Sequence, residues 1–144
     1  MIPTDPGLCD VNYACLLIPR VASQVLDGDL ADYLKREIPN IFIAHGWLLK
    51  VLEIEPTHLQ WLVSIPPSMA PEDHIHVVRQ LSSQLILTNF AKFDKKKYIR
   101  DYWAPGYLLS SGKQLIPREG ITAFIQMNRE RYYCEENPLT DPVA

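Results

Sequence analysis

The sequence has no long apolar run, no paired cysteines and no excess of positive charge. No apolar stretch approaches the roughly 20 residues that a membrane-spanning helix needs. The opening MIPTDPGLCD lacks the basic start and apolar core of a secretory signal. Cys9, Cys15 and Cys134 are an odd number at wide spacing, without the CxxC pair of zinc or redox sites. These absences predict a cytoplasmic protein whose thiols are reduced and structural.

Standard catalytic motifs are also absent. The sequence shows no glycine-rich phosphate loop and no Ser-His-Asp arrangement, and nothing near His45 supplies an acid, a base or an oxyanion donor in a known pattern. The net charge of −3 and the pI of about 5.8 give no whole-molecule attraction to phosphate. Any binding of nucleic acid would therefore depend on a local basic patch.

The composition is that of one compact domain. With 144 residues, of which 47% are hydrophobic and 22% charged, the chain is long enough to bury a substantial core. No repeat or low-complexity segment divides it. We expect a single domain over residues 1–144, in which residues from about 135 to 144, with Pro138 and Pro142, form a flexible tail.

Apolar patterning predicts a strand, a helix and a hairpin in the first half of the chain. A buried strand over 12–19 precedes a helix that starts near residue 26, and Pro39 should end or kink this helix near Ile38. Two strands, 47–55 and 58–65, then form a hairpin. In the second strand one set of alternate residues is apolar and predicts one face in the core: Leu59, Trp61, Val63 and Ile65, against His58, Gln60, Leu62 and Ser64.

The second half predicts a helix, a short strand and a last helix. Pro71 begins a helix that runs to about Phe90, with acidic residues in its first turn. A strand at Leu108-Leu109 and a helix over 117–133 follow. The order strand, helix, strand, strand, helix, strand, helix fits an α+β fold, a ferredoxin-like sandwich (βαββαβ) with an additional C-terminal helix.

Five phrases occur in one order between Asn12 and Arg131. They are LLIPR, PTHLQWLVSIPPS, VVRQLSSQLILTNF, DYWAPGYLLSSG and ITAFIQMNRER. Their order and spacing resemble the HUH-type single-tyrosine transposases of small bacterial insertion sequences. In that family the corresponding segments are the opening strand, the HUH strand with its proline turn, a helix with paired serines, a tryptophan-glycine-aromatic strand and the nucleophile helix.

The resemblance implies a defined chemistry. Two histidines one residue apart on a strand point the same way and hold one divalent metal. The metal polarises a scissile phosphate while a helix tyrosine attacks it. The resemblance also implies a homodimer that grips single-stranded or hairpin DNA.

Two positions needed for that chemistry are altered here. The first HUH histidine corresponds to His58, but the second corresponds to Gln60. The nucleophilic tyrosine corresponds to Phe124, which has no hydroxyl, and a polar residue that assists metal binding corresponds to Asn128. We therefore expect no catalytic residues and no cofactor, although the side-chain oxygens of Gln60 and Asn128 could contact magnesium weakly.

Two other features imitate catalytic groups. Asp73-His74-Ile75-His76 spells an HUH motif, but on a helix its two histidines diverge by about 200° and cannot share a metal. If this segment were a strand, an active site would return. Tyr132 and Tyr133 lie roughly 12 Å along the last helix from Phe124, too far to replace the nucleophile. We interpret His58 as a half-buried, hydrogen-bonded histidine and Phe124 as a core residue.

One connector concentrates basic residues and is followed by aromatic ones. Five of the fourteen Lys and Arg residues fall in it: Lys92, Lys95, Lys96, Lys97 and Arg100. Tyr98, Tyr102, Trp103 and Tyr107 follow, of the type that stacks on single-stranded bases, although we assign Trp103 and Trp61 mainly to the core. The connector is a candidate nucleic-acid-binding segment; the alternative is a solvated loop.

Three functions remain open from the sequence. The first is a transposase-derived protein that binds single-stranded or hairpin DNA without cutting it. The second is a protein-interaction module on the same fold, which the net charge of −3 favours. The third is an active transposase with displaced chemistry that uses His76 or a C-terminal tyrosine such as Tyr132.

Overall fold

The computed structural model describes residues 10–90 and 101–140, with side chains as far as residue 132. Its elements run in the predicted order: β1 (Val11–Leu17), α2 (Gly28–His45), β2 (Leu48–Glu55), β3 (His58–Ile65), α3 (Pro71–Asn89), β4 (Leu108–Ser111) and α4 (Arg118–Thr140). None of the helices in these residues is long and apolar enough to cross a membrane.

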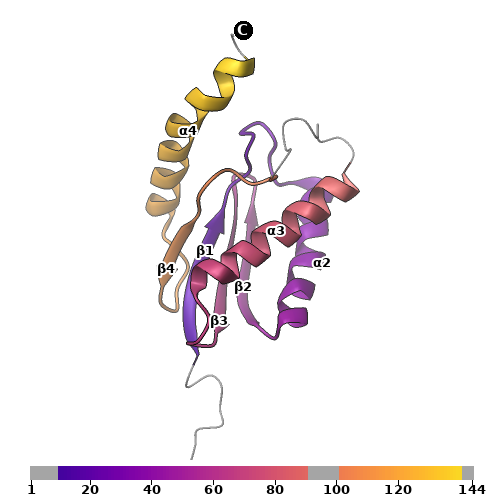
Figure 1. Ribbon diagram of the computed structural model, residues 1–144, viewed down its shortest axis with the longest axis vertical. Helices are drawn as coiled ribbons and strands as arrows, with labels where there is room; N and C mark the ends of the chain where they lie inside the picture. The colour runs from indigo at the N-terminus through magenta and orange to yellow at the C-terminus, as the bar shows by residue number, and fades with distance from the viewer. Residues whose placement is uncertain (1–9, 91–100, 141–144) are drawn as a thin grey trace, which may run out of the picture.

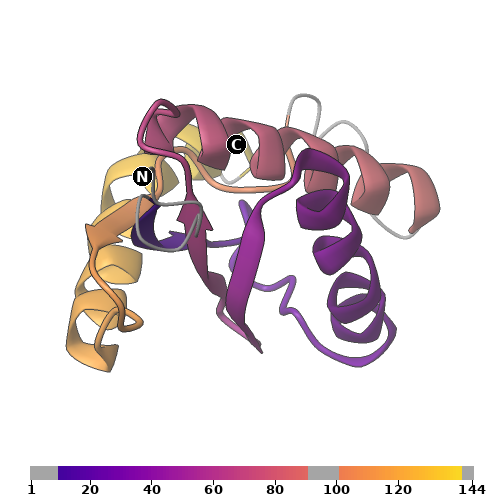
Figure 2. The ribbon, with the colours of Figure 1, turned by 90° about the horizontal axis from the view of Figure 1, so that it is seen from below.

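The four strands form one antiparallel sheet in the order β2-β3-β1-β4. Helices α2 and α3 cover one face of this sheet, and α4 lies across the other (Figure 1). Figure 2, which looks along the sheet from below, shows α4 separated from α2 and α3 by the strands. The predicted α+β ferredoxin-like sandwich with an additional C-terminal helix is confirmed.

The face of strand β3 that its alternation predicts to be in the core lies there, and the opposite face is buried as well. Leu59, Trp61 and Val63 belong to the core beneath α2 and α3. On the other face Leu62 belongs to a second core, which includes Ile121 of α4. The polar residues of β3 are therefore covered as well, because the last helix replaces solvent on their side of the sheet.

Helix α2 does not end near Ile38, which is one of the two outcomes predicted for Pro39. Helix α2 continues to His45 and ends where Gly46 adopts a left-handed conformation with φ of 74°. A proline inside a helix costs about 3 kcal/mol because it removes one hydrogen bond and crowds the preceding turn. Beyond it, Ile41 and Phe42 are buried, and each buried side chain of this size contributes about 1.5–3 kcal/mol. Burial offsets the local penalty.

The last helix is longer than predicted. Helix α4 runs to Thr140, beyond residue 133, and so includes part of the segment that we expected to form a flexible tail. Residues 141–144 lie outside the described part of the chain. Of the three cysteines only Cys15 has a described side chain: it is a free, fully buried thiol, and burial raises its pKa to about 12. This agrees with a structural role for Cys15.

The paired serines of α3 anchor the segment that precedes β4. Ser83 Oγ accepts a hydrogen bond from the backbone N–H of Tyr102 at 2.7 Å, and Ser82 Oγ accepts one from Trp103 Nε1 at 2.9 Å. Both aromatic side chains are fully buried. Trp61 and Trp103 are core residues as predicted, and neither Tyr102 nor Trp103 presents a surface on which a base could stack.

Candidate functional site

The β2–β3 hairpin places three polar side chains together on the α4 side of the sheet. His58 and Gln60 are two residues apart on β3 and therefore point to the same face. The two-residue turn between the strands pairs Glu53 of β2 directly with Gln60. His58 is 8% and Gln60 1% exposed, so both need hydrogen-bond partners within the protein.

These partners converge on one carboxylate oxygen. Gln60 Nε2 donates to Glu53 Oε1 at 2.8 Å, and His58 Nε2 lies 3.0 Å from the same oxygen. Because an ionised carboxylate only accepts hydrogen bonds, the imidazole proton is assigned to Nε2. His58 Nδ1 then accepts from Thr57 Oγ1 at 3.0 Å. The other end of Gln60 is also bonded, since its Oε1 accepts the backbone N–H of Ile116 at 2.7 Å.

The network keeps Glu53 ionised. Burial alone would raise the pKa of this carboxyl, but the hydrogen bonds from His58 and Gln60, with smaller electrostatic contributions from His58 and Arg118, outweigh it and lower the pKa. At neutral pH the hairpin thus carries a negative charge at the point where its polar side chains meet.

A cleft of about 600 Å³ opens beside this cluster, between the hairpin and the start of α4. Its polar wall includes the cluster together with Glu55 and Arg118, and its apolar wall comes from the segment that leads into α4 and from α4 itself. The lining residues are Glu53, Glu55, Pro56, Thr57, His58, Gln60, Leu115, Ile116, Arg118, Ile121, Thr122, Ile125 and Gln126. Two carboxylates face one guanidinium, a balance that disfavours a phosphate group.

The residues present do not fit the divalent metal that the resemblance implies. A metal needs lone pairs from several side chains directed at one point, but Gln60 Oε1 accepts a backbone N–H and Glu53 Oε1 already accepts two hydrogen bonds, which leaves the second carboxylate oxygen of Glu53 as a single ligand. The Nε2 atom of His58 carries a proton toward Glu53. Within residues 10–90 and 101–132, no three His, Cys, Asp or Glu side chains are grouped so as to hold a metal ion.

Phe124 and Asn128 lie outside the cleft that His58 and Gln60 line. Phe124 is half-buried and packs against the core between α4 and the sheet, as predicted. Asn128 is 6% exposed, and its Nδ2 donates to the carbonyl oxygen of Pro105 at 2.7 Å. The structure therefore brings His58 and Gln60 together, whereas neither Phe124 nor Asn128 is among the residues that line the cleft beside them.

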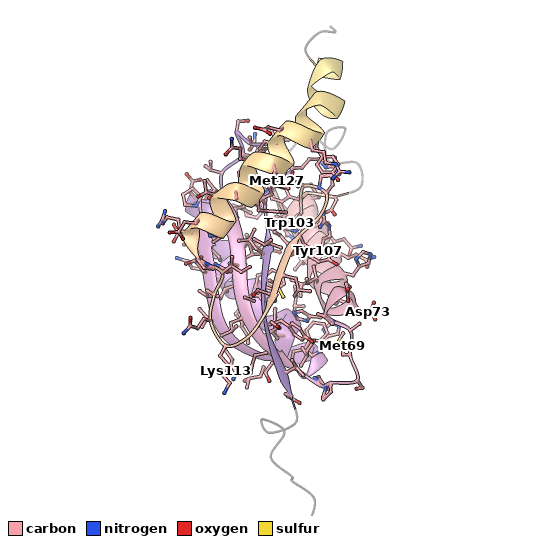
Figure 3. All side chains as sticks on the ribbon, turned by 90° about the vertical axis from the view of Figure 1, so that its left-hand side faces the viewer. Met69, Asp73, Trp103, Tyr107, Lys113 and Met127 are labelled. Atoms are coloured by element: carbon pink, nitrogen blue, oxygen red, sulfur yellow. The ribbon has the colours of Figure 1, made fainter. Side chains whose placement is uncertain are left out.

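The literal HUH motif lies on helix α3, as predicted, and its histidines diverge. His74 is fully buried, and its Nε2 accepts a hydrogen bond from Trp61 Nε1 at 2.9 Å. Burial, and to a smaller extent the charge of His45, lowers the pKa of His74 to about 4. His76 is exposed on another side of the helix. Figure 3 shows the neighbouring Asp73 at the start of this helix, on the opposite side of the sheet from α4.

The remaining candidate residues are only partly described. Lys92, Lys95, Lys96, Lys97, Arg100 and Tyr98 lie outside the described residues. Tyr107 is half-buried. Tyr132 is half-buried on α4, with the guanidinium of Arg131 5.6 Å from its ring centre, and the side chain of Tyr133 is outside the described part.

Glu53 is the central residue that the sequence analysis missed. A signal for it exists, because the Pro56-Thr57 turn pairs Glu55 with His58 and, two residues further along each strand, Glu53 with Gln60. The partner of Gln60 on the other side, the backbone N–H of Ile116, has no such signal. It depends on how the segment before α4 packs against the sheet.

Comparisons with known proteins identify the family. The family model described as "Transposase IS200 like" matches residues 8–128. The chain is 25% identical over 126 residues to the ISDra2 transposase TnpA of Deinococcus radiodurans, covering 88% of this chain and 86% of that protein.

Two solved structures are similar in fold. A crystal structure described as a transposase of Deinococcus radiodurans R1 has a TM-score of 0.69 at 22% identity and covers 91% of this chain and 97% of that one. A REP-associated tyrosine transposase bound to a REP hairpin has a TM-score of 0.51 at 10% identity and covers 85% and 68%. With a family match over most of its length and the same fold as these structures, the chain belongs to the IS200-like transposase family and is a relative of the single-tyrosine transposases.

Proposed function

We propose that this transposase relative binds single-stranded or hairpin DNA without cutting it. The observation that carries the proposal is Phe124, which stands where the resemblance places the nucleophilic tyrosine and packs, half-buried, against the core between α4 and the sheet. A phenyl ring has no oxygen with which to attack a phosphate. The hydrogen-bonded state of His58 and Gln60 supports the same conclusion, because neither side chain is free to hold a catalytic metal.

Family membership and the fold support DNA as the ligand. One structural neighbour carries a REP hairpin, and its fold matches most of this chain. Because Glu53 and Glu55 make the cleft acidic, we place the DNA-binding surface elsewhere, at the basic connector that contains Lys95, Lys96 and Arg100. Single strands and hairpins are the DNA forms that we propose, and a homodimer is the assembly that the resemblance implies.

The acidic cleft favours one other candidate function, a protein-interaction module. A cleft with two carboxylates and apolar walls suits a basic side chain with an aliphatic stem better than it suits a phosphate. An active enzyme that uses the second HxH is less compatible with the geometry, since His74 is enclosed in the core and His76 is not beside it. Tyr132 would remain as an alternative nucleophile in such an enzyme.

A cleavage assay run in parallel with a binding assay tests the proposal. End-labelled hairpin DNA is incubated with the protein and magnesium, then resolved on a denaturing gel for nicked strands and covalent protein-DNA adducts. We expect a shifted complex on a native gel and neither product on the denaturing gel. An adduct would contradict the proposal. Its loss in Tyr132→Phe, but not in Tyr107→Phe, would then identify the nucleophile.

A further inference from the structure

We propose that the carboxylate of Glu53 occupies the position of a cation: Glu53, His58 and Gln60 form a closed hydrogen-bonded unit that is complete without metal. The resemblance implies a divalent ion at this place, and the donors and acceptors found there contradict it. The inference concerns the site itself. It stands or falls independently of whether the protein binds DNA.

The side chains of His58, Gln60 and Glu53 converge on one point. Side chains two residues apart on β3 point at a common centre, and Glu53 Oε1 lies at that centre, 3.0 Å from His58 Nε2 and 2.8 Å from Gln60 Nε2. A cation would need lone pairs directed at it from both side chains. Glutamine supplies an N–H group instead, and an N–H donor requires a negative centre. The change from histidine to Gln60 thus reverses the charge that the site can accept.

Reversing the orientation of the Gln60 amide would cost free energy. Its Oε1 accepts the backbone N–H of Ile116, a residue that is 9% exposed, just before the first turn of α4. Rotating the amide to present its oxygen to the cleft would leave that buried N–H without an acceptor and would turn the amide N–H groups away from Glu53. Gln60 is therefore satisfied at both ends, and it ties the β2–β3 hairpin to the start of α4.

The wall of the cleft beside the cluster is negatively charged. Glu53 has a lowered pKa and a side chain that is 34% exposed, so its charge is present at neutral pH and faces the cleft. Glu55 adds a second carboxylate to the same wall. A phosphate group at the position implied by the resemblance would be repelled by the carboxylates of Glu53 and Glu55, because no cation lies between it and them. The cluster thus disfavours the binding of a metal ion and, with it, the binding of a phosphate group in this cleft.

Manganese binding to the wild-type protein tests the proposal directly. Free Mn²⁺ has a strong electron paramagnetic resonance signal that is lost on binding, and we expect the full free-ion signal at millimolar manganese. Nitrogen-15 NMR should also show His58 protonated on Nε2, with no change when magnesium is added. Loss of the manganese signal, prevented by His58→Ala, would overturn the proposal, as would a magnesium-dependent change of the His58 tautomer.

A gain-of-binding variant tests the convergence itself. Gln60→His replaces the N–H donor by a second imidazole, which together with His58 and Glu53 makes two histidines and a carboxylate, a set typical of zinc. In a His76→Gln background, we expect Zn²⁺ to raise the Tm of this variant but not that of the parent. Adding Glu53→Ala should abolish the gain, and Gln84→His, on an exposed part of α3, is the matched control. A folded Gln60→His variant that gains no zinc binding would contradict the convergence. If the Gln60→His variant does not fold, the manganese and NMR measurements on the wild-type protein still test the proposal.

Discussion

A hydrogen-bonded histidine lies at each face of β3, and the two histidines differ in the element that supplies them and in their surroundings. Under α2 and α3, His74 reaches the sheet from a helix, accepts a bond from Trp61 and is surrounded by aromatic rings. Under α4, His58 lies on the strand itself and binds the carboxylate of Glu53 beside an open cleft. The first histidine of the intact HxH motif belongs to the structural core, whereas the degenerate motif lines the cleft.

The difference shows that the protonation and hydrogen bonding of a histidine depend on its surroundings and not on the sequence motif in which it occurs. An apolar enclosure disfavours the charged imidazole and lowers the pKa of His74 to about 4. Beside Glu53 the same ring finds an anion that accepts its N–H. The first network stabilises the fold, and the second determines which ligand the cleft can accept.

The largest expected effect comes from the core side of β3. Trp61→Ala should lower the free energy of unfolding by about 3–5 kcal/mol, because it leaves a large cavity and removes the hydrogen bond to His74. Urea denaturation followed by circular dichroism measures this. Met127, which Figure 3 shows on the outer side of α4 and which is 67% exposed, provides the control. Met127→Ala should change stability by less than about 0.5 kcal/mol. Equal effects would contradict the assignment of Trp61 to the core.

The second effect is a loss of stability in acid that depends on His74. The unfolded chain protonates this imidazole near pH 6.5 and the folded chain only near pH 4, so stability falls as the pH falls between these values. The full loss is on the order of 3 kcal/mol. Thermal melts across this range should show a flatter profile for His74→Gln, which keeps an acceptor for Trp61 but does not titrate. His76→Gln should keep the wild-type slope, and a slope that follows His76 instead would refute the interpretation.

A third, smaller effect tests the polar side. Gln60→Ala should destabilise the protein by about 1–3 kcal/mol, because the buried N–H of Ile116 and an acceptor position of Glu53 lose their partner. Glu55→Ala, at an exposed position of the same hairpin, should have little effect. Chemical denaturation of both variants makes the comparison. Comparable losses would mean that the cluster contributes nothing specific.

The smallest expected effect is on DNA cleavage. Restoring both altered positions with Gln60→His and Phe124→Tyr would create nicking only if a tyrosine at 124 reaches the cleft. Because residue 124 packs against the core and does not line that cleft, we expect metal binding without nicking. A gel assay with labelled hairpin DNA and manganese measures it. Metal-dependent nicking would show that α4 moves relative to the sheet.

Much of the fold follows from local patterns in the sequence. Period-two alternation and the Pro56-Thr57 turn define the hairpin, and Pro71 followed by acidic residues marks the start of α3, which correctly separates His74 from His76. The covering of His58 and Gln60 by α4 could not be read this way, since it depends on which face of the sheet the last helix packs against. The continuation of α2 through Pro39 depends likewise on tertiary burial of Ile41 and Phe42.

The site was predictable in part. Resemblance identified His58 and Gln60 as a pair on one face, and the structure places them together. Glu53 required the strand register, and the Ile116 N–H required the tertiary packing of the segment before α4. That Phe124 and Asn128 do not line the cleft could not be predicted from helical spacing alone, because that spacing says nothing about the helix's position on the sheet.

The most direct test of the central claim is a fluorescence-anisotropy titration of the wild-type protein with hairpin DNA and a matched duplex, at low and high salt, with magnesium or with EDTA. The account predicts binding that prefers the hairpin, weakens as salt rises because phosphate contacts release counterions, and is the same with magnesium and with EDTA. No binding at low salt would contradict it and would favour a protein-interaction module. Binding that requires magnesium would contradict the metal-free site.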